Sequence, residues 1–324
     1  MRLFQCILCL LVPLAGHALE VNGTSYVRLT DVAGKLGMRS SWLEKGERLR
    51  LDSSWTRMDF EVHKREMLLN GLRVHLGYPV VESKGRLYLS ESDLTHQIRP
   101  ILTPQLNGPP PKLRHIILDP GHGGKDPGAE NLPVGLREKA LALDLAMRLQ
   151  KRLQAEGFRV TLTRTEDRFI PLRERALLAN RLEGDLFISL HFNASGKSGV
   201  EGVETFVYTP VMQPSTSRAD LHASDRKSYP GNRDGAWSTL LAYYVQRSLE
   251  EELGAADRGL KRARFTVLEE LSMPGILVEG GFVTHPAEGR NIGSRGYRDR
   301  IAAALVEAVQ VYQRTLQRLA REAS

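Results

Sequence analysis

Four side chains between residues 122 and 279 belong to the residue types that bind a catalytic metal ion or carry protons. His122, His191 and Glu279 each follow a short apolar run typical of a buried strand, and Glu138 begins a segment with helical periodicity. Because the carboxyl ends of strands in an α/β sheet lie along one edge, groups from three strand ends can meet in space. We expect Glu138 to project toward the same edge.

This set of residue types indicates a hydrolytic zinc site. Two imidazoles and one carboxylate are the protein ligands of catalytic zinc sites in which a fourth position stays open for water. Zinc lowers the pKa of that water from about 15.7 to about 7, and a carboxylate outside the ligand set can take the proton. The prediction is that His122, Glu138 and His191 bind Zn²⁺ and that Glu279 is the catalytic proton carrier.

Each of these residues also has an ordinary structural interpretation. His122 can be a loop histidine, and His191 can cap a turn. Glu138 can stabilise a helix N-terminus, and Glu279 can pair in a buried salt bridge. Taken from the residues alone, a zinc hydrolase is therefore a hypothesis. The glycines around His122 permit a tight loop, and a phosphate site there is disfavoured because the Gly-Lys-Ser/Thr ending of a P-loop is missing.

The elements that must position these groups alternate between strand and helix over residues 113–317. This alternation predicts an α/β fold in which a central sheet is flanked by helices on both faces. The expected strands are 115–119, 158–163, 186–190, 203–208 and 276–278, and the expected helices are 138–153, 172–182, 237–253 and 297–316.

Residues 19–102 differ in character and read as short strands separated by turns. The expected strands are 26–29, 49–51, 58–62 and 86–89, with a short helix at 29–36. Asn70-Gly71 is a strong two-residue hairpin signal. Two segments, 21–29 and 83–90, both place a turn before an aromatic strand. This mostly-β α+β region resembles the N-terminal domain of copper amine oxidases, which implies a wall-binding or spacer domain. It implies no copper site, since His63, His75 and His96 lack ligand spacing and are expected at the surface.

A proline-rich linker separates the two regions. Residues 103–112 contain four prolines and one glycine, which cannot continue a helix or a central strand. We therefore expect two domains, 19–102 and 113–317.

The first 18 residues have the plan of a secretory signal peptide: Arg2, an apolar stretch, and small residues before a cut after Ala18. This predicts export to the periplasm or cell envelope and a mature chain without a membrane span. The only cysteines, Cys6 and Cys9, lie in this segment, which excludes thiol chemistry and disulfides in the mature chain.

Composition narrows the class of protein further. With 41% hydrophobic and 26% charged residues, the chain is ordinary for a globular protein and disorder along most of its length is excluded. The net charge of +7 suits polyanionic surroundings, but nothing in the chain reads as a nucleic-acid motif.

A series of motifs then resembles the zinc-dependent N-acetylmuramoyl-L-alanine amidases of the AmiC type (the amidase 3 family). In order, the matching segments are 118–124, 126–129, Glu138, 160–167, 172–175 with 179–180, 187–194, 202–205, 257–261 and 273–282. The resemblance covers about 200 residues, and such an ordered series is poorly explained by chance.

The resemblance implies a peptidoglycan hydrolase that cleaves the amide between N-acetylmuramic acid and L-alanine. It makes His122, Glu138 and His191 the zinc ligands and Glu279 the catalytic glutamate. Asn193 has two open interpretations, a hydrogen bond near the site or a turn residue after the strand. Some members carry a helix that blocks the site until a partner removes it, so a protein regulator is one implied partner.

The polar insertion at 209–236 has no clear amphipathic helix and is expected to be a substrate-groove loop, with His222 exposed. His285, at a departure from the family pattern, is expected to be structural.

Two other functions remain open from the sequence. One is a wall-binding protein without activity, although such a protein would not need Glu279. The other is a zinc enzyme that cuts a different bond, such as a peptidase or a carbohydrate deacetylase.

Overall fold

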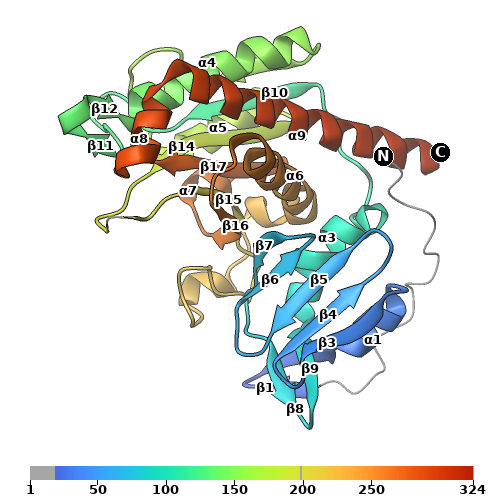
Figure 1. The fold of residues 1–324 in the computed structure, drawn as a ribbon. Coiled ribbons are helices and arrows are strands. Elements are labelled where there is room, and N and C mark those ends of the chain that lie inside the picture. The colour runs from blue at the N-terminus through green and yellow to red at the C-terminus, as the bar shows by residue number, and fades with distance from the viewer. Residues whose placement is uncertain (1–18, 198, 324) are drawn as a thin grey trace.

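One eleven-stranded sheet runs through both halves of the chain (Figure 1). The computed structural model describes residues 19–197 and 199–323, so the predicted signal peptide lies outside the described residues. The strand order is β13-β10-β14-β17-β15-β16-β7-β6-β5-β4-β3. Among the described residues, no helix combines the length and the apolar character needed to cross a membrane.

Six strands of this sheet come from the C-terminal half. They are β10 (His115–Pro120), β13 (Arg159–Leu162), β14 (Leu186–Asn193), β15 (Val203–Tyr208), β16 (Asp257–Ala263) and β17 (Gly275–Phe282). β13, β10, β14 and β17 are parallel, β15 is antiparallel to β17, and β16 is parallel to β15. All six residues of β10 are buried, as expected for a strand covered on both faces.

Helices cover both faces of these strands. α4 (Glu138–Ala155), α6 (Gly235–Leu253) and α9 (Arg295–Glu322) share one apolar core with Ile116 and Leu118. α5 (Leu172–Arg181) and α7 (Thr266–Glu269) pack in a second core with Ile117. Successive residues of a strand point to opposite faces, which is why neighbours on β10 enter different cores. The predicted α/β fold with helices on both faces is confirmed.

Two of the site strands are longer than the sequence predicts. Expected to end at residues 190 and 278, β14 continues to Asn193 and β17 to Phe282. His191 and Glu279 therefore lie within strands and are opposite each other in the ladder. The polar side chains at 191 and 279 do not end these strands, because the backbone hydrogen bonds between β14 and β17 continue past them.

A short hairpin, β11 (Glu130–Asn131) with β12 (Leu136–Arg137), leads into α4, and α8 (Pro286–Gly293) precedes α9.

The N-terminal half contains two antiparallel groups of strands. The first is a separate sheet of β1 (Leu19–Val21), β2 (Thr24–Arg28), β9 (Arg86–Ser90) and β8 (Val81–Ser83), joined to α1 (Leu29–Lys35). The second is the run β3 (Arg39–Glu44), β4 (Arg48–Asp52), β5 (Arg57–Glu61), β6 (Glu66–Leu69) and β7 (Leu72–His75). Asn70 and Gly71 join β6 to β7 with φ of 54° and 91°, which confirms the predicted hairpin.

The two halves are joined through the sheet itself, in addition to the proline-rich segment. β7 pairs in parallel with β16, with Val74 opposite Leu260. α2 (Glu91–Asp93), a π-helical turn (Leu94–Ile98) and α3 (Arg99–Leu102) follow β9, and the last two of these pack against α6. A 3₁₀ turn (Pro104–Leu106) then leads to β10. β16 escaped sequence prediction because its residues are mostly charged, although its backbone completes the ladder between β15 and β7.

Candidate metal centre

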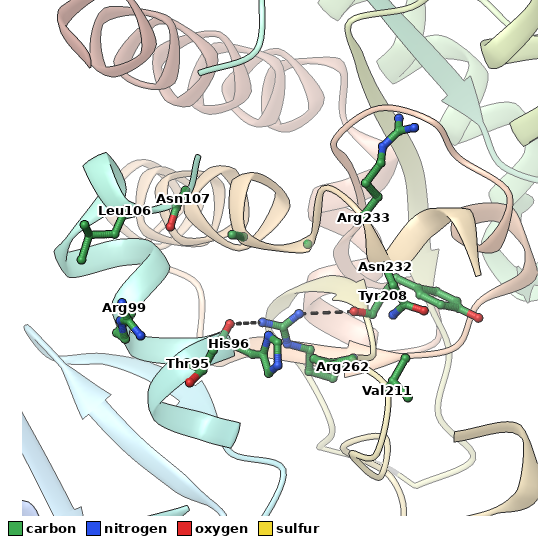
Figure 2. Close-up of a pocket in the computed structure, with 13 residues that line it drawn as sticks. Thr95, His96, Arg99, Leu106, Asn107, Tyr208, Val211, Asn232, Arg233 and Arg262 are labelled. Carbon is green, nitrogen blue, oxygen red and sulfur yellow. Dashed lines mark hydrogen bonds between the residues drawn. The ribbon is translucent and has the colours of Figure 1, made fainter. Parts of the chain in front are cut away.

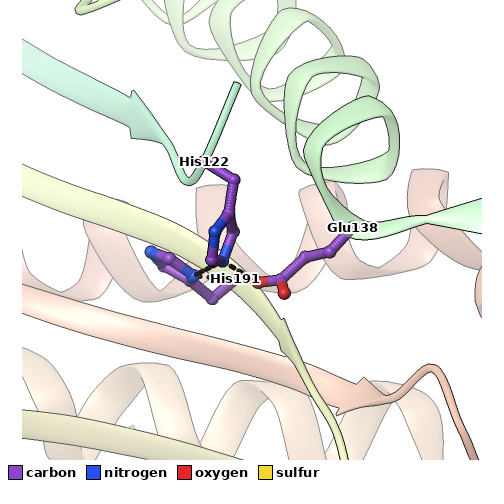
Figure 3. A group of neighbouring side chains, drawn as sticks. All are labelled: His122, Glu138 and His191. Carbon is purple, nitrogen blue, oxygen red and sulfur yellow. Dashed lines mark hydrogen bonds and ion pairs between the residues drawn. The ribbon is translucent and has the colours of Figure 1, made fainter. Parts of the chain in front are cut away.

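The side chains of His122, Glu138 and His191 converge from three different elements (Figure 3). His122 Nε2 lies 3.0 Å from Glu138 Oε1, and His191 Nδ1 lies 2.8 Å from the same oxygen. The two imidazole nitrogens are 3.1 Å apart. Ligands bound tetrahedrally to zinc at about 2.0–2.1 Å are about 3.3 Å from each other, so these three donor atoms have the spacing of ligands around one ion. The residues present fit a zinc ion.

The loop that carries His122 needs glycine because backbone and ligands approach closely. A Cβ at Gly121 would collide with the ring of His191. At Gly128, a Cβ would lie 2.6 Å from Glu138 Oε2 and 2.7 Å from the ring of His122. His122 itself has φ of 60°, a conformation that is uncommon outside glycine. The loop is therefore shaped by the ligand cluster.

The buried ion pair of Arg175 and Asp119 fixes the backbone of the loop that carries His122. Arg175 donates to Asp119 at 2.9 Å, to the carbonyl of Pro120 at 2.8 Å and to the carbonyl of His122 at 2.7 Å. Both charged side chains are at most 1% exposed. Asp119 also accepts hydrogen bonds from the hydroxyls of Thr163 and Ser189. Each member of the ion pair therefore has several hydrogen bonds, and Arg175 fixes the backbone of a predicted ligand.

A second buried arginine completes the support. Arg164 donates to the carbonyls of Pro120, Gly121 and Lys139 at 3.0, 2.6 and 2.7 Å. It thereby ties the end of β10 to the first turn of α4. Neither arginine could be assigned a role from the sequence, because the carbonyls that Arg164 and Arg175 bind and the carboxylate of Asp119 leave no spacing pattern in the chain.

Hydrogen bonds orient the ligands themselves. Asp126 lies 2.8 Å from His122 Nδ1 and so leaves Nε2 facing the cluster. Burial lowers the pKa of His122, but Glu138 and Asp126 more than offset this and raise it. Glu138 accepts from the amides of Phe192 and Ala129 at 3.0 and 2.7 Å. Burial would raise the pKa of Glu138, yet its hydrogen bonds with the two histidines hold it well below its usual range.

Glu279 lies beside the ligand cluster but outside it. On β17 it is opposite His191 of β14 on one side and Glu204 of β15 on the other. Its Oε2 is buried and, among the described residues, has no hydrogen-bond partner. Burial, followed by the charges of Glu138 and Glu204, raises the pKa of Glu279 well above its ordinary value, while Lys261 opposes this rise. A carboxyl group with one uncommitted oxygen is available to exchange a proton.

Asn193, on β14, reaches across β17 to a side chain of β15 and has no hydrogen bond to the three ligand side chains. Its Nδ2 donates to Glu204 Oε1 at 2.8 Å. Glu204 Oε2 accepts from Arg258 Nε at 2.8 Å and from Lys261 Nζ at 2.5 Å. Glu204, Arg258 and Lys261 occur in the motifs quoted above, but nothing in their spacing indicated that they would meet beside Glu279.

The insertion at residues 209–236 lies against the N-terminal half, so the expectation of a substrate-groove loop is wrong. The hydroxyl of Tyr78 donates to the carbonyl of Met212 at 2.5 Å, and Gln213 donates to Asp93 at 3.1 Å. The reason is the direction of β15, which is antiparallel to β17. Its carboxyl end therefore lies at the opposite edge of the sheet from the carboxyl end of β17.

A cavity of about 370 Å³ lies at this junction and is separate from the ligand cluster (Figure 2). Arg262 is one of its lining residues and is 2% exposed. It donates to the carbonyl of His96, to Gln97 Oε1 and to Thr239 Oγ1 at 2.6–2.8 Å, and to the carbonyl of Tyr208 at 3.3 Å. The guanidinium thus links the π-helical turn of the N-terminal half to the C-terminal half.

Three further histidines, His285, His222 and His75, lie outside the ligand cluster. As predicted, His285 is structural: its Nδ1 accepts from the amide of Glu288 at the start of α8. His222 is exposed, also as predicted. His75, expected at the surface, is half-buried, and its Nε2 lies 3.0 Å from the carbonyl of Arg258. The cause is the pairing of β7 with β16, which the sequence did not indicate.

Comparisons with known proteins show the family of this chain. The family model described as N-acetylmuramoyl-L-alanine amidase matches residues 116–311, more than half of the chain. LytC of Bacillus subtilis is 34% identical over 61% of this chain and 35% of its own length. AmiC of Neisseria meningitidis is 32% identical over 69% of this chain and 58% of its own length. The chain thus spans between about a third and three fifths of these two relatives.

A further relative and one solved structure extend the likeness. AmiA of Escherichia coli is 31% identical over 61% of this chain and 76% of its own length. The crystal structure of an N-acetylmuramoyl-L-alanine amidase from Clostridium difficile 630 superposes with a TM-score of 0.53 at 32% identity, covering 63% of this chain and 98% of that one. The matched family region begins at residue 116, so the resemblance of residues 19–102 to a copper amine oxidase domain stays a prediction. By its sequence and its fold, this chain belongs to the N-acetylmuramoyl-L-alanine amidase family.

Proposed function

We propose that this protein hydrolyses the amide bond between N-acetylmuramic acid and the L-alanine of the peptidoglycan stem peptide. In this proposal His122, Glu138 and His191 hold Zn²⁺, and Glu279 is the general base. The observation that carries it is the meeting of three donor atoms within 4.8 Å of one another, next to a buried carboxyl group with a free oxygen. The substrate class follows from the names of the relatives.

The chain's own groups divide the chemistry between them. A zinc ion bound here would polarise the amide carbonyl and lower the pKa of water. Glu279 takes a proton from the attacking water at its free oxygen and delivers it to the departing amine nitrogen. Asp126 keeps the imidazole of His122 oriented through Nδ1, and the amides of Phe192 and Ala129 hold the carboxylate of Glu138, since these hydrogen bonds involve neither the substrate nor the contacts among the three ligands.

The location and the N-terminal half complete the proposal. Export to the periplasm or cell envelope, where the substrate lies, rests on the predicted signal peptide. For residues 19–102 we propose wall attachment or positioning. Because β7 extends the catalytic sheet, this half would hold the wall at a fixed orientation to the metal centre.

The test is digestion of purified peptidoglycan, followed by mass analysis of the soluble products. The proposal expects free stem peptides without sugar, a loss of this release after chelation, and its return when zinc is added. Shortened peptides or deacetylated sugars would instead show that another bond is cut. Zinc-loaded protein that binds the wall and releases nothing would support a binding function.

A further inference from the structure

A row of charged side chains leads from the ligand cluster across the sheet. His191, Glu279 and Glu204 lie in register on β14, β17 and β15, so their side chains share one face. On the next strand, β16, Arg258 lies beside Glu204, because Val203 pairs with Asp257 and Thr205 with Leu260. The row ends in an arginine that the proposed chemistry does not use.

This arginine is held firmly on three sides. Its Nε donates to Glu204 at 2.8 Å, and its guanidinium lies 4.9 Å from the centre of the Phe282 ring. Its backbone carbonyl lies 3.0 Å from His75 Nε2 of the N-terminal half. Asp257, the residue before it, accepts a hydrogen bond from the backbone amide of Arg73 at 2.6 Å. The side chain of Arg258 therefore loses little conformational entropy when a ligand binds.

The terminal nitrogens of Arg258 are nevertheless uncommitted. Among the described residues, neither Nη has a hydrogen-bond acceptor, and the side chain is 33% exposed. The buried arginines beside the metal centre differ, since Arg164 and Arg175 both use their Nη groups on protein acceptors. A planar guanidinium with two free Nη groups is the geometry that binds a carboxylate through two parallel hydrogen bonds.

The local charge favours the same ligand. Glu204 accepts from both Arg258 and Lys261, so two cations share one carboxylate. Lys261 is only 13% exposed, whereas Arg258 reaches solvent. The accessible part of this pair is therefore cationic, and an anion from outside would meet the Nη groups first.

We propose that Arg258 binds the terminal carboxylate of the peptide portion of the substrate, beyond the bond that is cut. This inference rests on the proposed function. With strands about 4.8 Å apart, the backbone of Arg258 is about 14 Å from that of His191. That distance equals about four residues of extended peptide, and fewer once the length of the arginine side chain is counted. A stem peptide, which ends in a free carboxylate, can span it while its first amide lies at the metal centre.

The experiment compares two muramyl peptides that differ only at the peptide terminus, a free carboxylate in one and a carboxamide in the other. For each, kcat and KM are measured with the unmodified chain, with Arg258→Met and with Arg247→Met. Arg247 is a suitable control, since it is a surface arginine on α6 paired with Glu251. Zinc content is measured for all three proteins. The same two peptides are also titrated into Glu279→Gln protein, with and without Arg258→Met, so that binding is read without turnover.

Arg258→Met is expected to raise KM for the carboxylate peptide about tenfold or more, with kcat and zinc content unchanged. It should leave the carboxamide peptide unaffected, and Arg247→Met should change neither. An equal loss with both peptides, or a fall in kcat alone, would overturn the inference and assign Arg258 to the support of Glu204. If the unmodified chain cuts neither peptide, the proposed function fails. The titration then decides separately: a carboxylate preference that depends on Arg258 supports this site, and equal binding of both peptides overturns it.

Discussion

Buried arginines are used differently at the two edges of the catalytic sheet. At the metal centre, Arg175 is paired with the buried carboxylate of Asp119 and donates to the loop that carries His122. At the junction with the N-terminal half, the hydrogen-bond acceptors of Arg262 among the described residues are all uncharged. Burial lowers the pKa of Arg262 to about 9, and Asp93 opposes the shift.

The difference shows what each arginine does. Arg175 fixes the loop of His122 within the C-terminal half, and the carboxylate of Asp119 neutralises its charge. Arg262 joins two halves through carbonyl, amide and hydroxyl oxygens, each of which contributes less than a carboxylate would. Removal of one charge should therefore cost more unfolding free energy at the metal centre than at the junction. At the junction the stabilisation is divided among several weaker hydrogen bonds.

The largest effect is expected at the metal centre from Glu279→Gln. This substitution keeps the shape of the side chain but removes the group that accepts a proton, so turnover should fall by about 10²–10⁴-fold. Zinc content should stay equal to that of the unmodified chain, because Glu279 is outside the ligand cluster. Peptide release and metal analysis on the same preparation test both points. Turnover close to the original rate would show that another group carries the proton.

Arg175→Met should give the largest loss of stability. It leaves the buried Asp119 without its charged partner, which costs about 3–5 kcal/mol of unfolding free energy. Zinc binding should weaken as well, since the carbonyl of His122 loses its donor. Urea denaturation measures the stability, with Arg173→Met as a control because Arg173 is an exposed arginine paired with Glu270. The control should change stability by about 0.5 kcal/mol or less; an equal change in both variants would mean that burial of the pair does not matter.

Arg262→Met should have a smaller effect, and at the other edge of the sheet. The loss of several hydrogen bonds to uncharged acceptors is expected to lower the unfolding free energy by about 1–3 kcal/mol. Zinc content and kcat should be unchanged, while amide exchange should become faster in the π-helical turn Leu94–Ile98. Hydrogen exchange followed by mass spectrometry tests this. Loss of zinc comparable to that in Arg175→Met would remove the distinction between the two edges.

The smallest effect is a pH dependence at the junction, where Asp225 anchors the insertion. Burial would raise the pKa of Asp225. Hydrogen bonds from the side chain of Arg218, from the backbone amide of His222 and from the side chain of Arg264 instead lower this pKa below its ordinary value of 3.8. A carboxyl group with a lowered pKa stabilises the fold above its unfolded-state pKa and loses that contribution as the pH falls through the folded-state value. The stability difference between the unmodified chain and Asp225→Asn should therefore shrink below about pH 4. A difference that stays constant from pH 6 to pH 3 would contradict this.

Much of the fold was predictable, because periodicity and strand-end residues are local properties. The apolar run before His122, the helix that begins at Glu138 and the Asn70-Gly71 hairpin all appear where the sequence indicated them. The strand ends at His191 and Glu279 were misplaced, since the sequence shows a change to polar side chains but not whether backbone pairing continues. The strand β16 was missed because its charged side chains give no strand pattern, although its backbone pairs with β15 and β7.

The sequence by itself determined the residue types of the metal centre and the class of fold, since these follow from chemistry and from periods of 2 and 3.6 residues. Only the tertiary structure decided which groups meet. In the tertiary structure β15 runs antiparallel to β17, and the insertion therefore lies at the junction. β7 pairs with β16, and Arg258 lies at the end of the row that starts at His191. These contacts join residues that are far apart in the chain and depend on strand direction and register, which leave no signal in the sequence of either partner.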